Sequence, residues 1–193
     1  MNEASKSATV RAFLACDPPE EVRRGIAAIQ NRLKKQFGSA VRWVRPEGIH
    51  LTLKFFGDIP MNAVETIGGV VHEQVRGLSS LSLQVQKIGV FPNAGRPRVI
   101  WLGITGDVGR LVALQKKIDA GLQICGFDKE DRAFSPHLTL GRVKSPQGMA
   151  GLGKVIEEGN AAAGEFQASE LILFKSDLKP DGAVYTKLKV FPF

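Results

Sequence analysis

Residues 49–56 read IHLTLKFF and residues 136–143 read PHLTLGRV, so the tetrapeptide HLTL occurs twice in a chain of 193 residues. Side chains alternate between the two faces of a strand, so the histidine and the threonine of each copy share one face. The two histidines stand 87 residues apart (137 − 50), which is close to half of the chain. This spacing predicts two similar lobes, each contributing one His-x-Thr strand to a shared cleft.

Strand and helix patterns surround both copies of the motif. Alternating apolar residues predict strands, and apolar residues that recur every three to four positions predict helices. Strands are expected at 10–16, 41–44, 49–56, 81–91, 98–104 and 137–143, with a C-terminal hairpin of 170–175 and 184–190. Helices are expected between Asp17 and Gly38, over 60–78, between Asp107 and Gly126, and over 149–158. This order predicts an α+β fold of two pseudo-symmetric lobes, each a mostly antiparallel sheet with helices on the outside, flanking a central cleft in a single domain over residues 1–193.

Four other side chains receive specific expectations from the sequence. Strand alternation places Phe56 on the face of His50, where the ring either packs in the core or stacks on a base, and places Phe55 on the opposite, apolar face. Asp17 is expected to cap the helix that follows it, with a glutamate three residues later completing a capping box. Tyr185, a scattered aromatic residue, is expected to pack in the core or to cap it.

The composition favours a polyanionic partner. Lys and Arg number 26 against 19 Asp and Glu, which gives a formal net charge of +7 and a sequence pI near 9.6. Cys16 and Cys125 lack the spacing of a disulfide framework or a zinc site. No apolar run approaches the roughly 18 residues of a membrane-spanning helix, so we expect a soluble, cytoplasmic monomer with no membrane association and no obligate protein partner.

The paired motifs predict acid–base chemistry on a phosphodiester, with His50 and His137 dividing the two proton transfers. A neutral imidazole is a base and a protonated one is an acid, and the reference pKa of an imidazole, about 6.5, permits both near neutral pH. The hydroxyls of Thr52 and Thr139 are expected to donate hydrogen bonds to the non-bridging oxygens of the phosphate. This chemistry needs no cofactor and no metal, and neither a His-Glu-x-x-His motif nor a carboxylate cluster lies near these strands.

Residues 43–58, WVRPEGIHLTLKFFGD, and residues 135–142, SPHLTLGR, resemble the two-histidine (2H) phosphoesterase superfamily. Within it, the chain is similar to RNA 2′,3′-cyclic phosphodiesterases, also called 2′-5′ RNA ligases. The resemblance implies that the partner is an RNA ending in a 2′,3′-cyclic phosphate, which is hydrolysed to a 2′-phosphate. It also implies that His50 is the proton donor and His137 the proton acceptor, although the near-twofold symmetry of the motifs does not itself separate the two roles.

Arg142, five residues after His137, is similar to a family arginine near the phosphate, which a guanidinium could bind bidentately. Regular alternation places Arg142 on the face opposite His137, so a turn or bulge at Gly141 is required. Two other functions remain open. The same residues could run the reverse reaction, 2′-5′ RNA ligation, or the chain could be a non-catalytic RNA-end binding module that uses them only as phosphate donors.

Overall fold

The computed structural model describes residues 8–159, 161–180 and 182–193. The strands are β1 Thr9–Cys16, β2 Val41–Trp43, β3 Leu51–Pro60, β4 Leu81–Phe91, β5 Val99–Gly106, β6 His137–Val143, β7 Ala162–Ala168, β8 Glu170–Lys179 and β9 Gly182–Pro192. The helices are α1 Glu20–Phe37, α2 Ala63–Val75, α3 Val108–Ile124 and α4 Leu152–Glu158. Short 3₁₀ turns follow α1 (η1 Gly38–Ala40), β2 (η2 Pro46–Gly48) and β6 (η3 Pro146–Met149).

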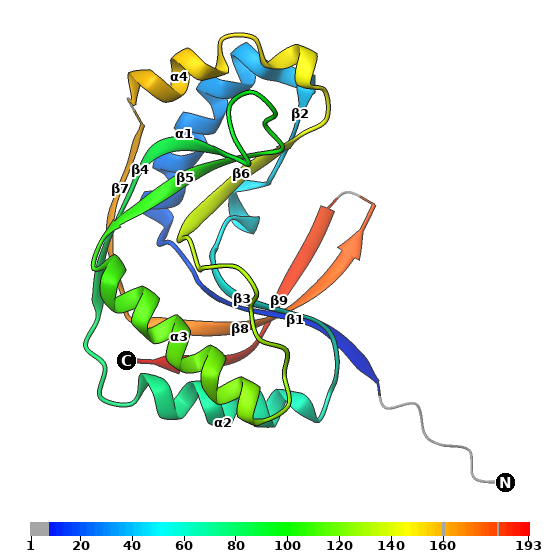
Figure 1. The fold of residues 1–193 in the computed structure, drawn as a ribbon, viewed down its shortest axis with the longest axis vertical. Coiled ribbons are helices and arrows are strands. Elements are labelled where there is room, and N and C mark those ends of the chain that lie inside the picture. The colour runs from blue at the N-terminus through cyan, green and yellow to red at the C-terminus, as the bar shows by residue number, and fades with distance from the viewer. Residues whose placement is uncertain (1–7, 160, 181) are drawn as a thin grey trace, which may run out of the picture.

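The strands form one antiparallel sheet that divides into two halves at the pairing of β3 with β6. The sheet order is β7-β4-β5-β6-β3-β1-β8-β9, with β2 paired to β6. The halves meet through one pair of opposed residues, Leu51 and Leu138, the second residues of the two HLTL motifs. Helices α1 and α4 lie with the first half and α2 and α3 with the second, giving an upper and a lower lobe (Figure 1). This arrangement confirms the predicted α+β fold of two lobes.

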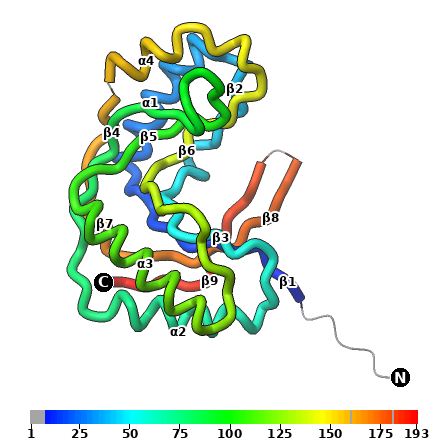
Figure 2. The backbone as a smooth tube through the Cα atoms, viewed as in Figure 1, coloured from blue at the N-terminus to red at the C-terminus, as the bar shows by residue number. Residues whose placement is uncertain are grey.

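Each lobe is assembled from both halves of the sequence. Helix α1 follows strand β1 of the lower lobe but packs against β7 of the upper lobe. Helix α3 follows β5 of the upper lobe but packs against α2 and β3 of the lower lobe. Figure 2 shows the backbone passing from one lobe to the other before each of these two helices. The two lobes are therefore related by an exchange of helices, and neither lobe is a continuous segment of the chain.

The helices bury the apolar stripes that their spacing predicts. In α1, Ile26 and Leu33 are 0% and 1% exposed, and in α3, Ile118 and Leu122 are 1% and 0% exposed. These side chains belong to one hydrophobic core that includes residues of both lobes. In the described ranges, the structure contains no helix with the length and apolar character needed to cross a membrane. The shared core fixes the two motif strands side by side and so positions the site between the lobes.

Candidate active site

The two HLTL motifs place their polar residues on one face of the sheet. The leucines that follow the histidines oppose each other in antiparallel strands, and both are fully buried. In this register His50 lies opposite Thr139, and Thr52 lies opposite His137. Opposed residues share a face of the sheet, and in this register the two histidines stand diagonally to each other.

A β-bulge follows each motif threonine. Strand β3 skips Leu53 in its pairing with β1, because Thr52 and Lys54 on either side of it pair with consecutive residues of β1. Strand β6 skips Leu140 in its pairing with β5 in the same way. The bulge predicted at Gly141 therefore exists but lies one residue earlier, at the fourth residue of the motif. Both copies of HLTL end in the same irregularity.

The bulges change the face of the residues that follow them. Phe55 and Arg142, each five residues after a motif histidine, line the same pocket as the motif threonines. Phe55 is 65% exposed, whereas Phe56 packs against the core with its ring edge-on to Phe127 at a centroid distance of 5.7 Å. The prediction that Phe56 shares a face with His50 is therefore wrong, because the bulge shifts the alternation by one residue.

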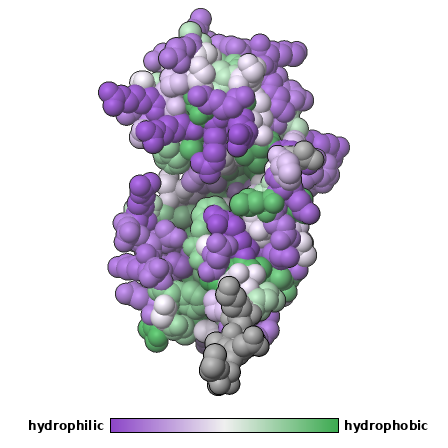
Figure 3. Space-filling model, turned by 90° about the vertical axis from the view of Figure 1, so that its right-hand side faces the viewer, coloured by the Kyte–Doolittle hydropathy of each residue, from purple (hydrophilic) through white to green (hydrophobic). Residues whose placement is uncertain are grey.

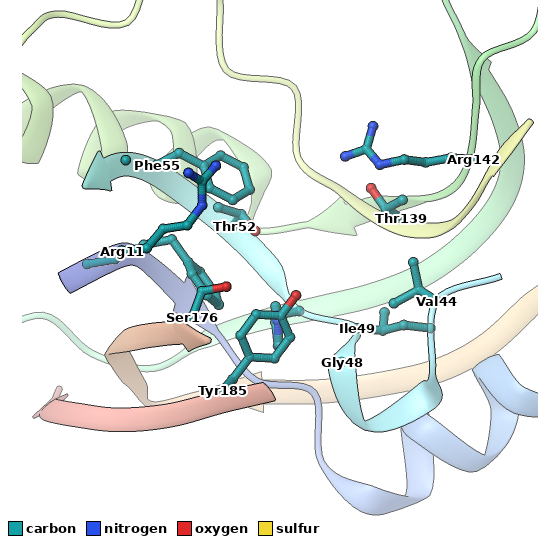
Figure 4. A pocket seen from close by; sticks show the side chains of 14 residues that line it. Arg11, Val44, Gly48, Ile49, Thr52, Phe55, Thr139, Arg142, Ser176 and Tyr185 are labelled. Carbon is teal, nitrogen blue, oxygen red and sulfur yellow. The ribbon is translucent and has the colours of Figure 1, made fainter. Parts of the chain in front are cut away.

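A pocket of about 200 Å³ lies between the lobes, and Figure 3 shows this side of the molecule hollowed at mid-height. Figure 4 shows Arg11, Phe55 and Thr52 on one side of the pocket and Thr139 and Arg142 across it. Four of the five predicted site residues line the pocket, and His137 does not. The lining residues are Arg11, Ala12, Phe13, Val44, Gly48, Ile49, His50, Thr52, Phe55, Gly57, Thr139, Arg142, Ser176 and Tyr185.

His50 is enclosed by aromatic rings. Its ring centroid lies 5.0 Å from that of Phe13, 5.4 Å from that of Phe174 and 4.6 Å from that of Tyr185. Its Nδ1 atom lies 3.3 Å from Oδ1 of Asp17, while its Nε2 atom is buried without a hydrogen-bond partner among the described residues. Because a carboxylate accepts hydrogen bonds, Nδ1 carries a hydrogen, and Nε2 is the atom left to exchange a proton with a ligand.

Asp17 does not cap helix α1, so the predicted capping box is wrong. The N-cap position is Pro19, without a side-chain hydrogen bond, and the Asp17 carboxylate instead contacts His50 and, at 3.2 Å, Nη2 of Arg23. Burial acts to raise the pKa of Asp17, but the hydrogen bond with His50 and the charge of Arg23 outweigh it and lower that pKa below its ordinary value. The carboxylate is therefore ionised at neutral pH and available to a neighbouring imidazole.

His137 occupies the equivalent place on β6 with different partners. Its Nδ1 atom lies 2.7 Å from the main-chain carbonyl oxygen of Ser135. A carbonyl oxygen can only accept a hydrogen bond, so this Nδ1 also carries a hydrogen. Nε2 is then the nitrogen available for proton exchange. The ring of Phe91 lies edge-on to His137 at a centroid distance of 5.0 Å, and that of Trp101 lies at 6.2 Å. Both histidines therefore have the same fixed tautomer when neutral.

The sequence family described as LigT-like phosphoesterase matches residues 16–101 and 102–185, so each match contains one HLTL motif. The chain belongs to this family.

A protein from Methanothermobacter thermautotrophicus named RNA 2′,3′-cyclic phosphodiesterase is 39% identical over 183 residues, covering 94% of this chain and 98% of its own. A protein of the same name from Methanocaldococcus jannaschii is 35% identical, covering 93% and 99%. A crystal structure of a Thermus thermophilus protein, 29% identical, has a TM-score of 0.76 and covers 94% and 97%. The predicted resemblance to two-histidine phosphoesterases is confirmed.

Three polar pocket residues of this phosphoesterase are not among the site residues that its sequence predicts. Arg11 comes from β1, and Ser176 and Tyr185 come from the β8–β9 hairpin. Burial raises the pKa of Tyr185, against the lowering effect of the Arg142 charge, so its phenol is neutral at physiological pH. The expectation that Tyr185 packs on the core is confirmed, since its ring packs against Phe13 and Phe174, and the same ring also lies against His50. No local pattern signals that approach.

A buried thiol also lies near the site. The thiol of Cys16 is buried, and its burial together with the charges of Asp17 and Glu170 raises its pKa to about 12, so it stays protonated. Within the described residues, no three His, Cys, Asp or Glu side chains gather closely enough to hold a metal ion. The polar side chains that line the pocket thus offer imidazole, hydroxyl and guanidinium groups, and Asp17 adds a carboxylate beside His50.

Proposed function

We propose that this phosphoesterase hydrolyses the 2′,3′-cyclic phosphate at the end of an RNA to a 2′-phosphate. The observation that carries the proposal is the antiparallel pairing of the two HLTL strands, which sets two imidazoles and two hydroxyls on one face. The relatives at 39% and 35% identity are named RNA 2′,3′-cyclic phosphodiesterases. The formal net charge of +7 also favours a polyanionic substrate.

In the proposed reaction the two histidines act on opposite sides of the phosphorus. Nε2 of His137 takes a proton from a water molecule, whose oxygen forms a bond to phosphorus. The P–O3′ bond breaks, and the 3′-oxygen takes the proton from Nε2 of His50. The phosphate stays on the 2′-oxygen. His50 then regains a proton from solvent, and His137 releases one, which restores the starting state.

The remaining predicted residues stabilise charge on the phosphate in this proposal. The hydroxyls of Thr52 and Thr139 donate hydrogen bonds to the non-bridging oxygens, where negative charge accumulates in the transition state. The guanidinium of Arg142 pairs with the same group, since it reaches the pocket from the strand that carries Thr139 (Figure 4). A site between two lobes limits access of bulk water, which strengthens each of these interactions.

Replacing either catalytic histidine tests the proposal. His50→Ala and His137→Ala are each expected to lower hydrolysis by about 100- to 10,000-fold, because each removes one proton transfer. The substrate is an RNA oligonucleotide ending in a 2′,3′-cyclic phosphate, in buffer containing EDTA, and the position of the product phosphate is read by phosphorus NMR. His72→Ala is the matched control, since His72 is the third histidine, lies exposed on α2 and is expected to leave the rate unchanged.

Three outcomes would contradict the proposal. Full activity in either variant would remove that histidine from the chemistry. A 3′-phosphate product would show that the 2′-oxygen, and not the 3′-oxygen, is the leaving group. Tight, salt-sensitive binding of the cyclic-phosphate RNA by the unaltered protein without turnover would instead identify a non-catalytic RNA-end binding module.

A further inference from the structure

The two histidines differ in the group that accepts the hydrogen bond from Nδ1. Extending the pairing of β1 with β3 by one residue places Asp17 beside His50. The equivalent position beside His137 on β5 is Gly103, which has no side chain. His137 therefore bonds the neutral carbonyl of Ser135, whereas His50 bonds a carboxylate. The two motifs are therefore alike in sequence, but the groups that bind Nδ1 of their histidines differ.

Arg23 fixes the carboxylate in place. Its Nη2 atom lies 3.2 Å from Oδ1 of Asp17, and its Nη1 atom donates to the carbonyl oxygens of Pro46 at 3.0 Å and Ile49 at 3.4 Å. Ile49 directly precedes His50, so the guanidinium ties the carboxylate to the backbone that carries the histidine. The side chains of Asp17, Arg23 and His50 are 24%, 15% and 7% exposed, respectively. Low exposure keeps solvent from screening the contacts within this group.

The charged and titratable groups around His50 come from several parts of the fold. The β1–α1 connection contributes Asp17 and helix α1 contributes Arg23. Strand β9 contributes Tyr185, against the imidazole, and Lys187, whose charge acts on Asp17. Strand β6 contributes Arg142 and strand β1 contributes Arg11, which both line the same pocket. Since the phenol of Tyr185 is neutral, Asp17 is the anion of this set, and it touches Nδ1 directly.

We propose that Asp17 is a positioning residue that makes His50 the proton donor, an inference that rests on the proposed hydrolysis. The carboxylate accepts the Nδ1–H bond and stabilises the imidazolium, so the transferable proton sits on Nε2. The rings of Phe13, Phe174 and Tyr185 pack around this imidazole and hold it in place. When the P–O3′ bond breaks, the 3′-oxygen takes this proton and the imidazole becomes neutral. His137 faces only a neutral carbonyl at Nδ1, so it has no carboxylate to stabilise its imidazolium, and it accepts the proton of water.

Asp17→Asn tests this assignment, because it keeps the shape of the side chain and removes its charge. We expect kcat to fall by about 10- to 100-fold with KM changed by less than about threefold, as for outer groups that hydrogen-bond and orient a functional histidine. An amide stabilises the imidazolium less than a carboxylate does, so the alkaline limb of the kcat–pH profile is expected to move to lower pH. Asp17→Glu keeps the charge and is expected to restore part of the rate.

Asp107→Asn is the matched control. Asp107 also stands between a strand and a helix and pairs with an arginine, Arg110, at 3.2 Å, but it lies outside the pocket. This variant is expected to match the unaltered protein in rate and in pH profile. A change of the same size in both variants would assign the effect of Asp17→Asn to the fold and overturn the proposal.

Nitrogen NMR of the free protein separates this proposal from the proposed reaction. The doubly protonated form of His50 is expected to disappear at lower pH in Asp17→Asn than in the unaltered protein, while the titration of His137 is unchanged. That measurement needs no substrate, so it stands even if the protein fails to hydrolyse a cyclic phosphate. An unchanged His50 titration, or an Asp17→Asn profile that moves only on its acidic limb, would overturn the proposal, the latter because His50 would then act as the base.

Discussion

At the scale of single residues, each motif threonine lies opposite the histidine of the other motif. Each of the two motif imidazoles therefore has a hydroxyl as its neighbour on the adjacent strand. Thr52 and Thr139 are both partly exposed in the pocket. A hydroxyl at this point can donate to a non-bridging oxygen of a phosphate held between the histidines. Its removal therefore affects the transition state more than the folded state.

Thr139→Val replaces the hydroxyl with a methyl group of similar size. We expect kcat to fall on the order of 100-fold, as when one preorganised donor is lost from a charge-stabilising site. The free energy of unfolding should change by less than about 1 kcal/mol, because the side chain is only partly buried. Thr139→Ser keeps the hydroxyl and should retain most of the rate. Equal losses in the valine and serine variants would show that the methyl group, not the hydroxyl, is what the site requires.

At the scale of elements, the bulge in β3 turns Lys54 away from the pocket and toward helix α3. Its Nζ atom lies 2.7 Å from Oδ1 of Asp119 on α3 and 2.7 Å from the carbonyl oxygen of Asp128. The side chains of Lys54 and Asp119 are 4% and 10% exposed. This buried ion pair joins the first motif strand to the segment that leads from α3 to Ser135 and His137.

Lys54→Met leaves the Asp119 carboxylate buried without its cation. We expect the free energy of unfolding, measured by urea denaturation, to fall by about 3 to 5 kcal/mol, and a double variant that also carries Asp119→Leu to recover most of the loss. Lys189→Met is the matched control, because its 2.6 Å pair with Glu65 also joins two elements but is 30% and 79% exposed. That change should cost less than about 1 kcal/mol. Equal losses of unfolding free energy in Lys54→Met and Lys189→Met would show that burial does not make the Lys54–Asp119 pair the more stabilising of the two.

At the scale of the whole molecule, the crossing of α1 into the upper lobe depends on a close approach of two backbones. A Cβ atom on Gly25 of α1 would collide with the main-chain carbonyl of Ala163 on β7. Residues 25 and 163 are far apart in sequence, so this contact closes the chain over the upper lobe. Glycine is required there for space, since its backbone conformation is helical.

Gly25→Ala is therefore expected to lower the free energy of unfolding by about 1 to 3 kcal/mol through overpacking, although alanine is the better helix former. Gly69→Ala, in the exposed part of α2 with nothing within 4 Å of the added methyl group, should instead raise it by about 0.5 to 1 kcal/mol. Chemical denaturation of the two variants beside the unaltered protein gives both values. A stabilised Gly25→Ala variant would rule out the tight contact of α1 with β7.

Local sequence patterns predicted the four described helices and the described strands except β7, Ala162–Ala168, which no pattern indicated. Period-two alternation held from His50 to Thr52 and from His137 to Thr139, and it failed just beyond, at the two bulges. A bulge depends on which strand lies alongside, and that partner is distant in the chain. The same reason explains Asp17, whose local context is that of a helix cap but whose carboxylate bonds to an imidazole 33 residues away.

The sequence by itself determined that two equivalent His-x-Thr strands exist and that the chain resembles the two-histidine phosphoesterases. Local periodicity and a repeated motif are properties of short segments, so they can be read without a fold. Only the tertiary structure decided that helices exchange between the lobes, that Phe55 and Arg142 enter one pocket, and that one histidine of the pair faces a carboxylate. Those features depend on contacts between segments far apart in the chain, which form only when both lobes close around a common core.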